Sequence, residues 1–271
     1  MLRDITIGQY YQTESVIHSL DPRVKLMGTM VFIISLFIGR SVWMYLAVTL
    51  FLFGVIKLSK VPLQFIIKGL KAVLILVILS AAFNLFLTDG TVVLSLWKLT
   101  LTKEGIITAV FMVIRLLYLI MGSSLMTLTT TPNNLTDGLE KGLGFLKVIK
   151  VPVHEIAMMM SIALRFIPIL IEETDKIMKA QMARGADFEN GNLIEKAKAM
   201  IPILVPLFVS AFRRANDLAN AMEARCYHGS EGRTKMKPLK YTRNDRIAYG
   251  VLAVYLIGII ALNVFMGGRL V

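Results

Sequence analysis

Cysteine is nearly absent from this chain, with Cys226 the only one in 271 residues. A single cysteine excludes an intrachain disulfide, so nothing in the sequence indicates an oxidising compartment. Histidine is also scarce. His18, His154 and His228 lie far apart, without the HExxH or His-Cys spacing of a zinc site. The sequence therefore gives no support to a disulfide-stapled scaffold or to a metalloenzyme.

Catalytic and nucleotide-binding motifs are missing as well. Neither G-x-x-x-x-G-K-[ST] nor G-x-G-x-x-G occurs, and there is no G-x-S-x-G. The stretch "TDGLEKGLG" (Thr136–Gly144) begins like the Asp-Gly of membrane phosphoalcohol transferases but lacks their later paired aspartates. The first 23 residues are polar and lack the early apolar core of a cleavable signal peptide. We expect a chain that is not an enzyme and binds no cofactor of its own.

Apolar residues dominate instead. They make up 56% of the chain, and the mean hydropathy is +0.67, whereas soluble domains are nearer 45–50% apolar. Five runs approach the length that crosses roughly 30 Å of hydrocarbon. These runs are Val24–Gly39, Val42–Ile56, Ala72–Leu87, Ile106–Leu128 and Ile247–Met266. The basic, amphipathic segment Leu58–Lys71 is typical of the membrane interface. The sequence predicts an all-α membrane protein with about five transmembrane helices.

The segment Thr131–Arg246 has a different character, since it holds 18 of the 30 Lys and Arg residues and 13 of the 18 acids. Its two apolar stretches, Val153–Ile171 and Leu193–Phe212, contain charges and prolines. A charge deep in lipid costs about 2.5–3.5 kcal/mol on insertion scales. We therefore expect long amphipathic helices on, or partly sunk into, the cytoplasmic leaflet. The predicted division is residues 1–130 as a membrane part with four spans, 131–246 as the cytoplasmic helices, and 247–271 as a last transmembrane helix.

The basic residues predict the orientation. With the N-terminus in the cytoplasm, seven Lys and Arg in residues 1–25 and 57–71 and 18 in Thr131–Arg246 lie inside, against four outside. Those four are Arg40, Lys98, Lys103 and Arg269. The net charge of +12 thus fits the cytoplasmic-loop bias of membrane proteins. Aromatic residues are not interleaved with the basic ones, so no nucleic-acid partner is indicated.

Two features within the helices allow alternatives. Arg115 interrupts the fourth span, where it either faces a protein interface or serves transport. The methionine-rich stretch Ile156–Leu164 is either core filling or an adaptable docking face. A self-contained secondary transporter or channel is the alternative function. It would need several intramembrane acids or an inverted repeat, but all the acids lie outside the five spans.

One short pattern occurs twice. "KAQMARGADF" (Lys179–Phe188) and "NAMEARCYHG" (Asn220–Gly229) each carry an Ala-Arg pair at the end of a helical pattern. Their arginines, Arg184 and Arg225, are 41 residues apart. Each follows an apolar helix that contains proline, so one unit of structure is used twice.

Two interpretations compete for these endings. Arginine in a last turn complements the helix dipole, and Gly185 would form a left-handed cap. Helix termination alone accounts less well for Cys226, which has no preference for that conformation. The small neighbours Ala183 and Ala224 would instead let each helix end enter a narrow groove, where the guanidinium reaches fixed acceptors.

The chain resembles a known family in four segments that occur in the same order. They are "SLDPRVKL" (Ser19–Leu26), "ALRFIP" (Ala163–Pro168), "AQMARGADF" and "AMEARCY". Together they are similar to the transmembrane T component of energy-coupling factor (ECF) transporters, often called EcfT. The resemblance runs from about Ile5 to the last span.

This resemblance implies a scaffold subunit of an ATP-driven importer for vitamins or metal ions in the cell (plasma) membrane. Its partners would be two ABC-type ATPase subunits, which bind the ATP and Mg²⁺, and a substrate-binding S component. Carried over, Ala183-Arg184-Gly185 and Ala224-Arg225-Cys226 would contact the ATPases, and Thr130–Leu143 would be a first, shorter coupling helix. Cys226 departs from the family's usual glycine, which leaves the conformation of the second ending open.

Overall fold

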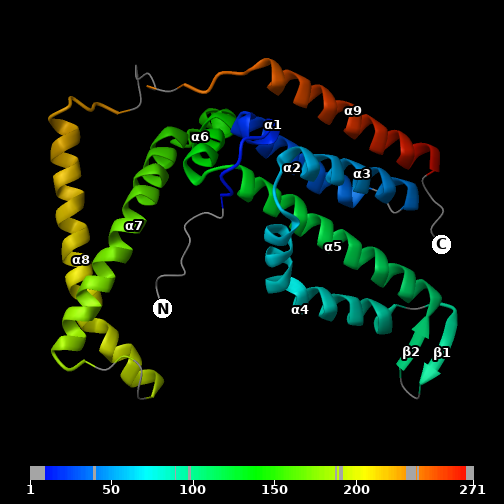
Figure 1. Cartoon of the computed structure of the whole chain (residues 1–271), viewed down its shortest axis with the longest axis horizontal. Coiled ribbons are helices and arrows are strands. Elements are labelled where there is room, and N and C mark those ends of the chain that lie inside the picture. Colours follow the sequence, from blue (N-terminus) through cyan, green and yellow to red (C-terminus); the bar gives the residue numbers. More distant parts are fainter. Residues whose placement is uncertain are drawn as a thin grey trace. The chain divides into compact units, whose positions relative to one another are not determined.

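The structure is a computed structural model that describes residues 10–38, 41–88, 90–96, 99–186, 188, 192–229, 236 and 238–266 (Figure 1). The predicted all-α class is confirmed. The helices are α1 (Val16–Ser19), α2 (Pro22–Ile38), α3 (Val42–Ser59), α4 (Leu63–Leu87), α5 (Lys103–Thr129), α6 (Pro132–Gly142), α7 (Val153–Ala183), α8 (Leu193–Glu223) and α9 (Arg243–Met266), with a 3-10 helix, η2 (Leu143–Ile149), after α6. The basic residues Arg40, Lys98 and Arg269, used to predict the orientation, lie outside the described residues.

A short antiparallel β-hairpin, which the sequence did not predict, joins α4 to α5. Its strands are β1 (Val92–Leu96) and β2 (Leu99–Thr102). Thr102 then caps α5, because its hydroxyl oxygen accepts a hydrogen bond from the Gly105 N–H at 3.1 Å. The same hydroxyl donates to the Thr88 carbonyl at 2.7 Å, which ties the start of α5 to the end of α4.

The described residues form two compact units. The first comprises those within Leu143–Pro238, and so contains α7 and α8. The second comprises those within Gly8–Gly142 and Leu239–Val271, with all the other helices except η2. Compactness does not report the side of the membrane on which a segment lies. The division into residues 1–130, 131–246 and 247–271 therefore stays a prediction.

The core of the second unit lies between α2, α3, α5 and α9. Leu36, Met44 and Val48 are completely buried there, and Ile259 of α9 is almost so. Gly122 of α5 permits this packing, since a Cβ at that position would lie only 2.5 Å from a ring carbon of Phe32. Small residues that allow helices to approach closely are a main source of packing energy in membranes.

Five elements have the length and composition of membrane spans. Among the described residues, α3, α5, α7 and α9 qualify as single helices. The fifth is α4, taken as the segments Leu63–Lys71 and Val73–Leu87, which meet at an angle of 62°. This bend lies where the predicted interfacial segment meets the predicted third span. The first predicted span corresponds to α2, whose 17 residues are at the short limit for crossing the bilayer.

Helix α7 differs from the sequence-based expectation. It is long and apolar enough to cross a membrane, although its charges predict a place at the cytoplasmic surface. Only 6% of its most apolar 18-residue window is buried inside the protein, so this surface requires lipid or a partner to cover it. The cytoplasmic placement of α7 stays a prediction.

Candidate functional site

The end of α7 carries the first arginine in a well-defined cap. Gly185 has a φ of +90°, the left-handed conformation that glycine adopts without strain. Its N–H donates to the Met182 carbonyl at 3.0 Å, and the Ala186 N–H donates to the Gln181 carbonyl at 3.0 Å. This pair of hydrogen bonds defines a Schellman motif, in which Arg184 is the last residue before the turn.

The end of α8 has the same cap without glycine. Cys226 has a φ of +55°, and its N–H donates to the Glu223 carbonyl at 2.9 Å. The Tyr227 N–H donates to the Met222 carbonyl at 3.1 Å. Arg225 therefore has the position in this Schellman motif that Arg184 has in the first. The conformation left open by the sequence is left-handed, and it places a non-glycine residue in a region that costs about 1–2 kcal/mol.

Both arginine endings face outwards. Ala183, Arg184 and Gly185 are exposed, and so are their counterparts Ala224, Arg225 and Cys226. Within the part of the chain that the structure describes, no side-chain hydrogen bond or ion pair holds either guanidinium. Both endings thus combine helix capping with an accessible cation, so the two sequence-based interpretations are compatible.

Helices α7 and α8 pack as an antiparallel pair, which places the two endings apart. Glu173 of α7 contacts Ser210 and Arg214 of α8, whereas Gln181, further along α7, contacts Pro202, earlier in α8. The end of α7 therefore lies beside the first half of α8, whereas Arg225 follows the end of α8. Measured along α8, the two arginines are separated by roughly 40 Å at 1.5 Å per residue.

A polar cluster joins the middle of the pair. The Ser210 hydroxyl donates to the Glu173 carboxylate, and both Nη2 and Nε of Arg214 donate to Oε2 of Glu173, at 2.9 and 3.3 Å. Charge-assisted hydrogen bonds of this kind are about twice as strong as neutral ones. The cluster therefore fixes how α7 and α8 are aligned along their axes.

A second contact uses a proline. Pro206 has no N–H, so the Pro202 carbonyl four residues earlier lacks its helical donor. The Gln181 side chain supplies a replacement, with Nε2 at 3.3 Å from that carbonyl oxygen. Gln181 precedes Arg184 by three residues, so the first arginine ending is linked directly to the proline-bearing part of α8.

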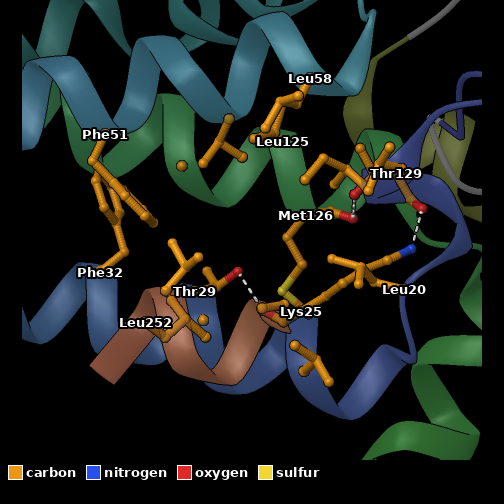
Figure 2. A pocket seen from close by; sticks show the side chains of 18 of the residues that line it. Leu20, Lys25, Thr29, Phe32, Phe51, Leu58, Leu125, Met126, Thr129 and Leu252 are labelled. Carbon is orange, nitrogen blue, oxygen red and sulfur yellow. Dashed lines mark hydrogen bonds between the residues drawn. The ribbon is translucent and has the colours of Figure 1, made fainter. Parts of the chain in front are cut away.

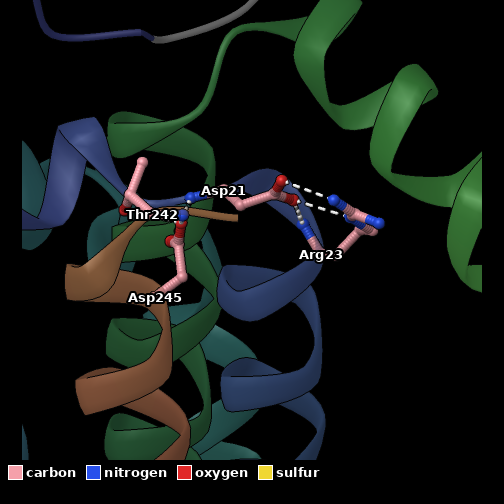
Figure 3. Close-up of polar contacts among 4 residues, drawn as sticks. All are labelled: Asp21, Arg23, Thr242 and Asp245. Carbon is pink, nitrogen blue, oxygen red and sulfur yellow. Dashed lines mark hydrogen bonds and ion pairs between the residues drawn. The ribbon is translucent and has the colours of Figure 1, made fainter. Parts of the chain in front are cut away.

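The segment "SLDPRVKL" contributes a different structure, an anchor between distant helices (Figure 3). Asp245, in the first turn of α9, is completely buried. Its carboxylate accepts hydrogen bonds from the Asp21 N–H at 2.8 Å and from the N–H and hydroxyl of Thr242, both at 2.7 Å. Asp245 therefore caps its own helix and holds the start of α2 at the same time.

Arg23 and Pro22 extend this anchor. The Arg23 guanidinium makes two hydrogen bonds to the Asp21 carboxylate, at 2.8 and 3.0 Å, and lies 3.9 Å from the centre of the Tyr241 ring. Pro22 packs against α6 at Gly138, where a Cβ would lie 2.9 Å from the proline Cβ. The Asp-Pro-Arg sequence thus positions α6, the expected first coupling helix, and α9 on the start of α2.

The sequence analysis missed Asp245, although a signal for it exists. "TRND" (Thr242–Asp245) precedes an apolar run in the pattern of a capping box. The contact of Asp245 with Asp21 could not be read from that pattern. Arg115 lies at a protein interface, where its Nε donates to the Tyr45 hydroxyl at 3.1 Å. This contact favours the interface alternative for Arg115.

The described part of the chain contains no group of three or more His, Cys, Asp or Glu side chains placed to hold a metal ion. The methionines of Ile156–Leu164 are not core filling throughout, since Met159 and Met160 are exposed. What the geometry provides is a pair of cationic helix ends on one linked helix pair. It is suited to binding other proteins rather than to chemistry.

Comparison with known proteins gives a consistent result. Residues 13–236 match the CbiQ family, described as "Cobalt transport protein". A protein from Ruminiclostridium cellulolyticum is 53% identical over 263 residues, which cover 97% of this chain and 98% of the relative. One from Clostridium kluyveri is 56% identical, with 92% and 93% covered, and one from Bacillus subtilis is 47% identical, with 90% and 93% covered. All three are named energy-coupling factor transporter transmembrane protein EcfT.

Proposed function

The chain belongs to the family of ECF transporter transmembrane proteins, and from this premise we propose that it is the membrane scaffold of an ATP-driven importer. It couples ATP hydrolysis by two ABC-type ATPase subunits to uptake through a substrate-binding S component. The substrates are vitamins or metal ions, and the scaffold itself is not catalytic. ATP and Mg²⁺ are bound by the ATPase subunits.

The observation that carries this proposal is the repeated arginine cap. Arg184 and Arg225 have the same position in two Schellman motifs with matching hydrogen bonds. Both are exposed and separated by most of the length of α8. Two equivalent endings so far apart suit two equivalent partners. Each guanidinium would enter a groove on one ATPase subunit and bind carboxylate or carbonyl acceptors there.

The link between α7 and α8 supports a mechanical role. When ATP closes the ATPase pair, both arginine endings move with their docking grooves. The Glu173 cluster and the contact of Gln181 with Pro202 make α7 and α8 respond together rather than separately. The motion passes to the S component, whose reorientation opens its substrate site to the cytoplasm.

An exposed apolar stripe on α8 suits the S component. The stripe recurs every three to four residues and consists of Ile201, Leu204, Val205, Phe208, Val209 and Phe212. An amphipathic helix buries such a face against lipid or a partner. Because the stripe includes the segment that contains Pro202 and Pro206, a change in the bend of α8 would be felt by a protein packed on it.

The orientation follows from the same premise. ATPase subunits require both arginine endings in the cytoplasm, so α7 and α8 lie at the cytoplasmic face of the plasma membrane. The excess of basic residues in Thr131–Arg246 agrees with this, as does an N-terminus on the cytoplasmic side.

Copurification tests the proposal. The full chain is tagged in its own host, extracted in mild detergent, and the associated proteins are identified and counted. We expect two ATPase subunits and one small hydrophobic protein per chain, and substrate uptake by reconstituted vesicles only with ATP inside the ATPase compartment. A chain that purifies without ATPases and transports substrate in vesicles on its own would instead be a self-contained transporter.

A further inference from the structure

An apolar groove lies within the second compact unit, away from the arginine endings (Figure 2). Its volume is about 360 Å³, within the range of small-molecule sites. Side chains of α1, α2, α3, α5 and α9 line it, among them Phe32, Phe51, Leu125, Ala248 and Leu252. Its wall is almost entirely hydrocarbon, so an occupant must be apolar along most of its length.

The groove continues into a polar mouth at the end of α3. A second, shallower pocket shares Val16 and Leu58 with the groove. The remaining residues of this pocket are Glu14, Ser15, Ser19, Lys57 and Lys60. Its two lysines are exposed and outnumber its single carboxylate, so the mouth is cationic. Groove and mouth together form one site with an apolar interior and a positive opening.

The polar end of the groove is held open by Lys25. Its Nζ donates to the carbonyls of Thr129 and His18, at 2.8 and 3.0 Å, and so joins α2 to the ends of α5 and α1. Figure 2 shows this side chain reaching from α2 to the Thr129 carbonyl. Both acceptors are backbone atoms at helix ends, so this end of the groove is part of the fold.

The depth of the groove matches one leaflet of a bilayer. Phe32 lies ten residues into α2, and Phe51 lies eight residues before the end of α3. At 1.5 Å per residue these positions are roughly 12–15 Å from the helix ends at the mouth. Half of a hydrocarbon core is about 15 Å thick. A single acyl chain entering beside the mouth would therefore end near the floor of the groove.

The volume favours a chain-like occupant over a helix. A helix at least 10 Å across would fit less than about one 5.4 Å turn into this space. An acyl chain has a much smaller cross-section and needs no polar partners along its length. The charge of the mouth then selects among lipids, because Lys57 and Lys60 attract an anionic headgroup.

We infer that this site binds an anionic phospholipid, with one acyl chain in the groove and the phosphate at Lys57 and Lys60. The lipid covers apolar side chains of five helices and so fastens the membrane part of the scaffold. This role is separate from ATPase coupling. It concerns a different face of the protein and is measured without ATPase subunits, so either proposal can fail while the other holds.

Native mass spectrometry tests the inference directly. The full chain is delipidated in mild detergent and titrated with phosphatidylglycerol or with phosphatidylcholine of the same acyl chains. We expect one tightly bound phosphatidylglycerol, at least tenfold tighter than phosphatidylcholine, and no displacement by free glycerol phosphate. Equal binding of the two lipids would overturn the inference, and so would displacement by the free headgroup.

Charge variants examine the mouth. Lys57→Gln with Lys60→Asn removes both charges, and asparagine tolerates the left-handed backbone of Lys60, whose φ is +54°. We expect at least a tenfold loss of phosphatidylglycerol affinity. The control Lys71→Gln removes an exposed basic residue outside both pockets and should leave the affinity unchanged. Equal losses in the two variants would mean general surface charge and no site.

Filling the groove examines its interior. Ala248→Phe places a ring in the groove, whereas Ala253→Phe makes the same change on the exposed face of α9. Only Ala248→Phe should lower the affinity, again at least tenfold. A photoreactive residue at position 248, used in membranes containing the whole complex, should capture lipid. Capture of a protein there, or an unchanged affinity in Ala248→Phe, would contradict the inference.

Discussion

The Gln181 side chain of α7 donates a hydrogen bond of 3.3 Å to the backbone carbonyl of Pro202 in α8. That carbonyl is available because Pro206, four residues later, has no N–H to offer it. A structural defect of one helix is thus compensated by a side chain of the other. The donor lies three residues before Arg184, so the contact connects a proposed ATPase ending to the proline-bearing segment of α8.

This relationship predicts a double-mutant cycle. Gln181→Ala in the natural chain leaves the Pro202 carbonyl without its donor, and we expect a loss of about 1 kcal/mol in stability together with weaker coupling of uptake to hydrolysis. Pro206→Ala restores an N–H at position 206, which can serve that carbonyl within α8. In this background Gln181→Ala should have little effect. Thermal unfolding in detergent and uptake per ATP hydrolysed provide the two readouts.

The cycle is interpretable because the two residues lie on different helices and change one acceptor in common. Additive effects of Gln181→Ala and Pro206→Ala would show that the carbonyl contact carries no coupling. Asn220→Ala, at an exposed position near the end of α8, serves as a control for the loss of a side-chain amide.

The two helix caps predict opposite responses to substitution. Cys226→Gly should stabilise the chain by about 0.5–1 kcal/mol, because glycine adopts a φ of +55° without strain. Gly185→Ala should destabilise it by about 1 kcal/mol, since a φ of +90° is unfavourable for alanine even though no atom obstructs the new Cβ. Midpoints of thermal unfolding compare the pair. A destabilising Cys226→Gly would mean that the thiol has a role beyond the cap.

The anchor on α9 predicts a large effect at a single carboxylate. Asp245→Ala leaves three donors without their acceptor in a buried place, so a loss of about 2–4 kcal/mol is expected. Asp245→Asn should be intermediate, because one oxygen remains. Asp217→Asn, an exposed carboxylate on α8, is the matched control and should be neutral. A neutral Asp245→Ala in thermal unfolding would contradict the anchor.

His18 predicts a dependence of stability on pH. Its Nε2 lies 3.0 Å from the Tyr11 carbonyl and must donate to it, so Nδ1 of the neutral ring accepts from the Ser15 hydroxyl at 2.7 Å. Burial, with a smaller contribution from the nearby Lys25 cation, holds the pKa of His18 below its ordinary value of 6.5. The folded chain therefore binds this proton less readily than the unfolded chain.

The stabilising effect of neutral His18 is complete above pH 6.5 and is lost as the pH falls from there towards the lowered pKa. Thermal unfolding should show a decline over this interval in the natural chain, and a smaller one in His18→Gln. His228→Gln, at an exposed histidine, should decline like the natural chain. Parallel curves for the natural chain and His18→Gln would show that other groups cause the decline.

Much of the fold was predictable because membranes impose simple rules. The predicted spans correspond to helices α2, α3, α5 and α9 and the second segment of α4, since an apolar run in lipid has few alternatives to a helix. The bend in α4 also lies at the predicted boundary near Lys71. The β-hairpin was missed because its nine strand residues follow no long apolar run.

The arginine endings were predictable from their repetition, but their shared geometry was not. Gly185 indicates a left-handed residue from its identity alone. Cys226 gives no such signal, and its conformation follows from the hydrogen bonds of Cys226 and Tyr227 with the last turn of α8. The contact of Asp245 with Asp21 joins residues 224 positions apart. Such pairings depend on tertiary packing, which one sequence does not reveal.

The central claim is that two equivalent arginine endings transmit the work of two ATPase subunits. It is tested most directly by substrate uptake per ATP hydrolysed, measured in vesicles that contain the full complex. The variants are Arg184→Ala, Arg225→Ala and the two together. The control is Arg165→Ala with Arg213→Ala, which removes one exposed arginine from each helix away from its end.

Buried arginines at the centre of interfaces contribute about 2 kcal/mol or more, so each single variant should lower coupled uptake by roughly 30-fold. The double variant should lose its ATPase subunits or hydrolyse ATP without uptake, while the control retains both. Unchanged assembly and uptake in the double variant would contradict the account, and would leave both arginines with no role beyond ending their helices.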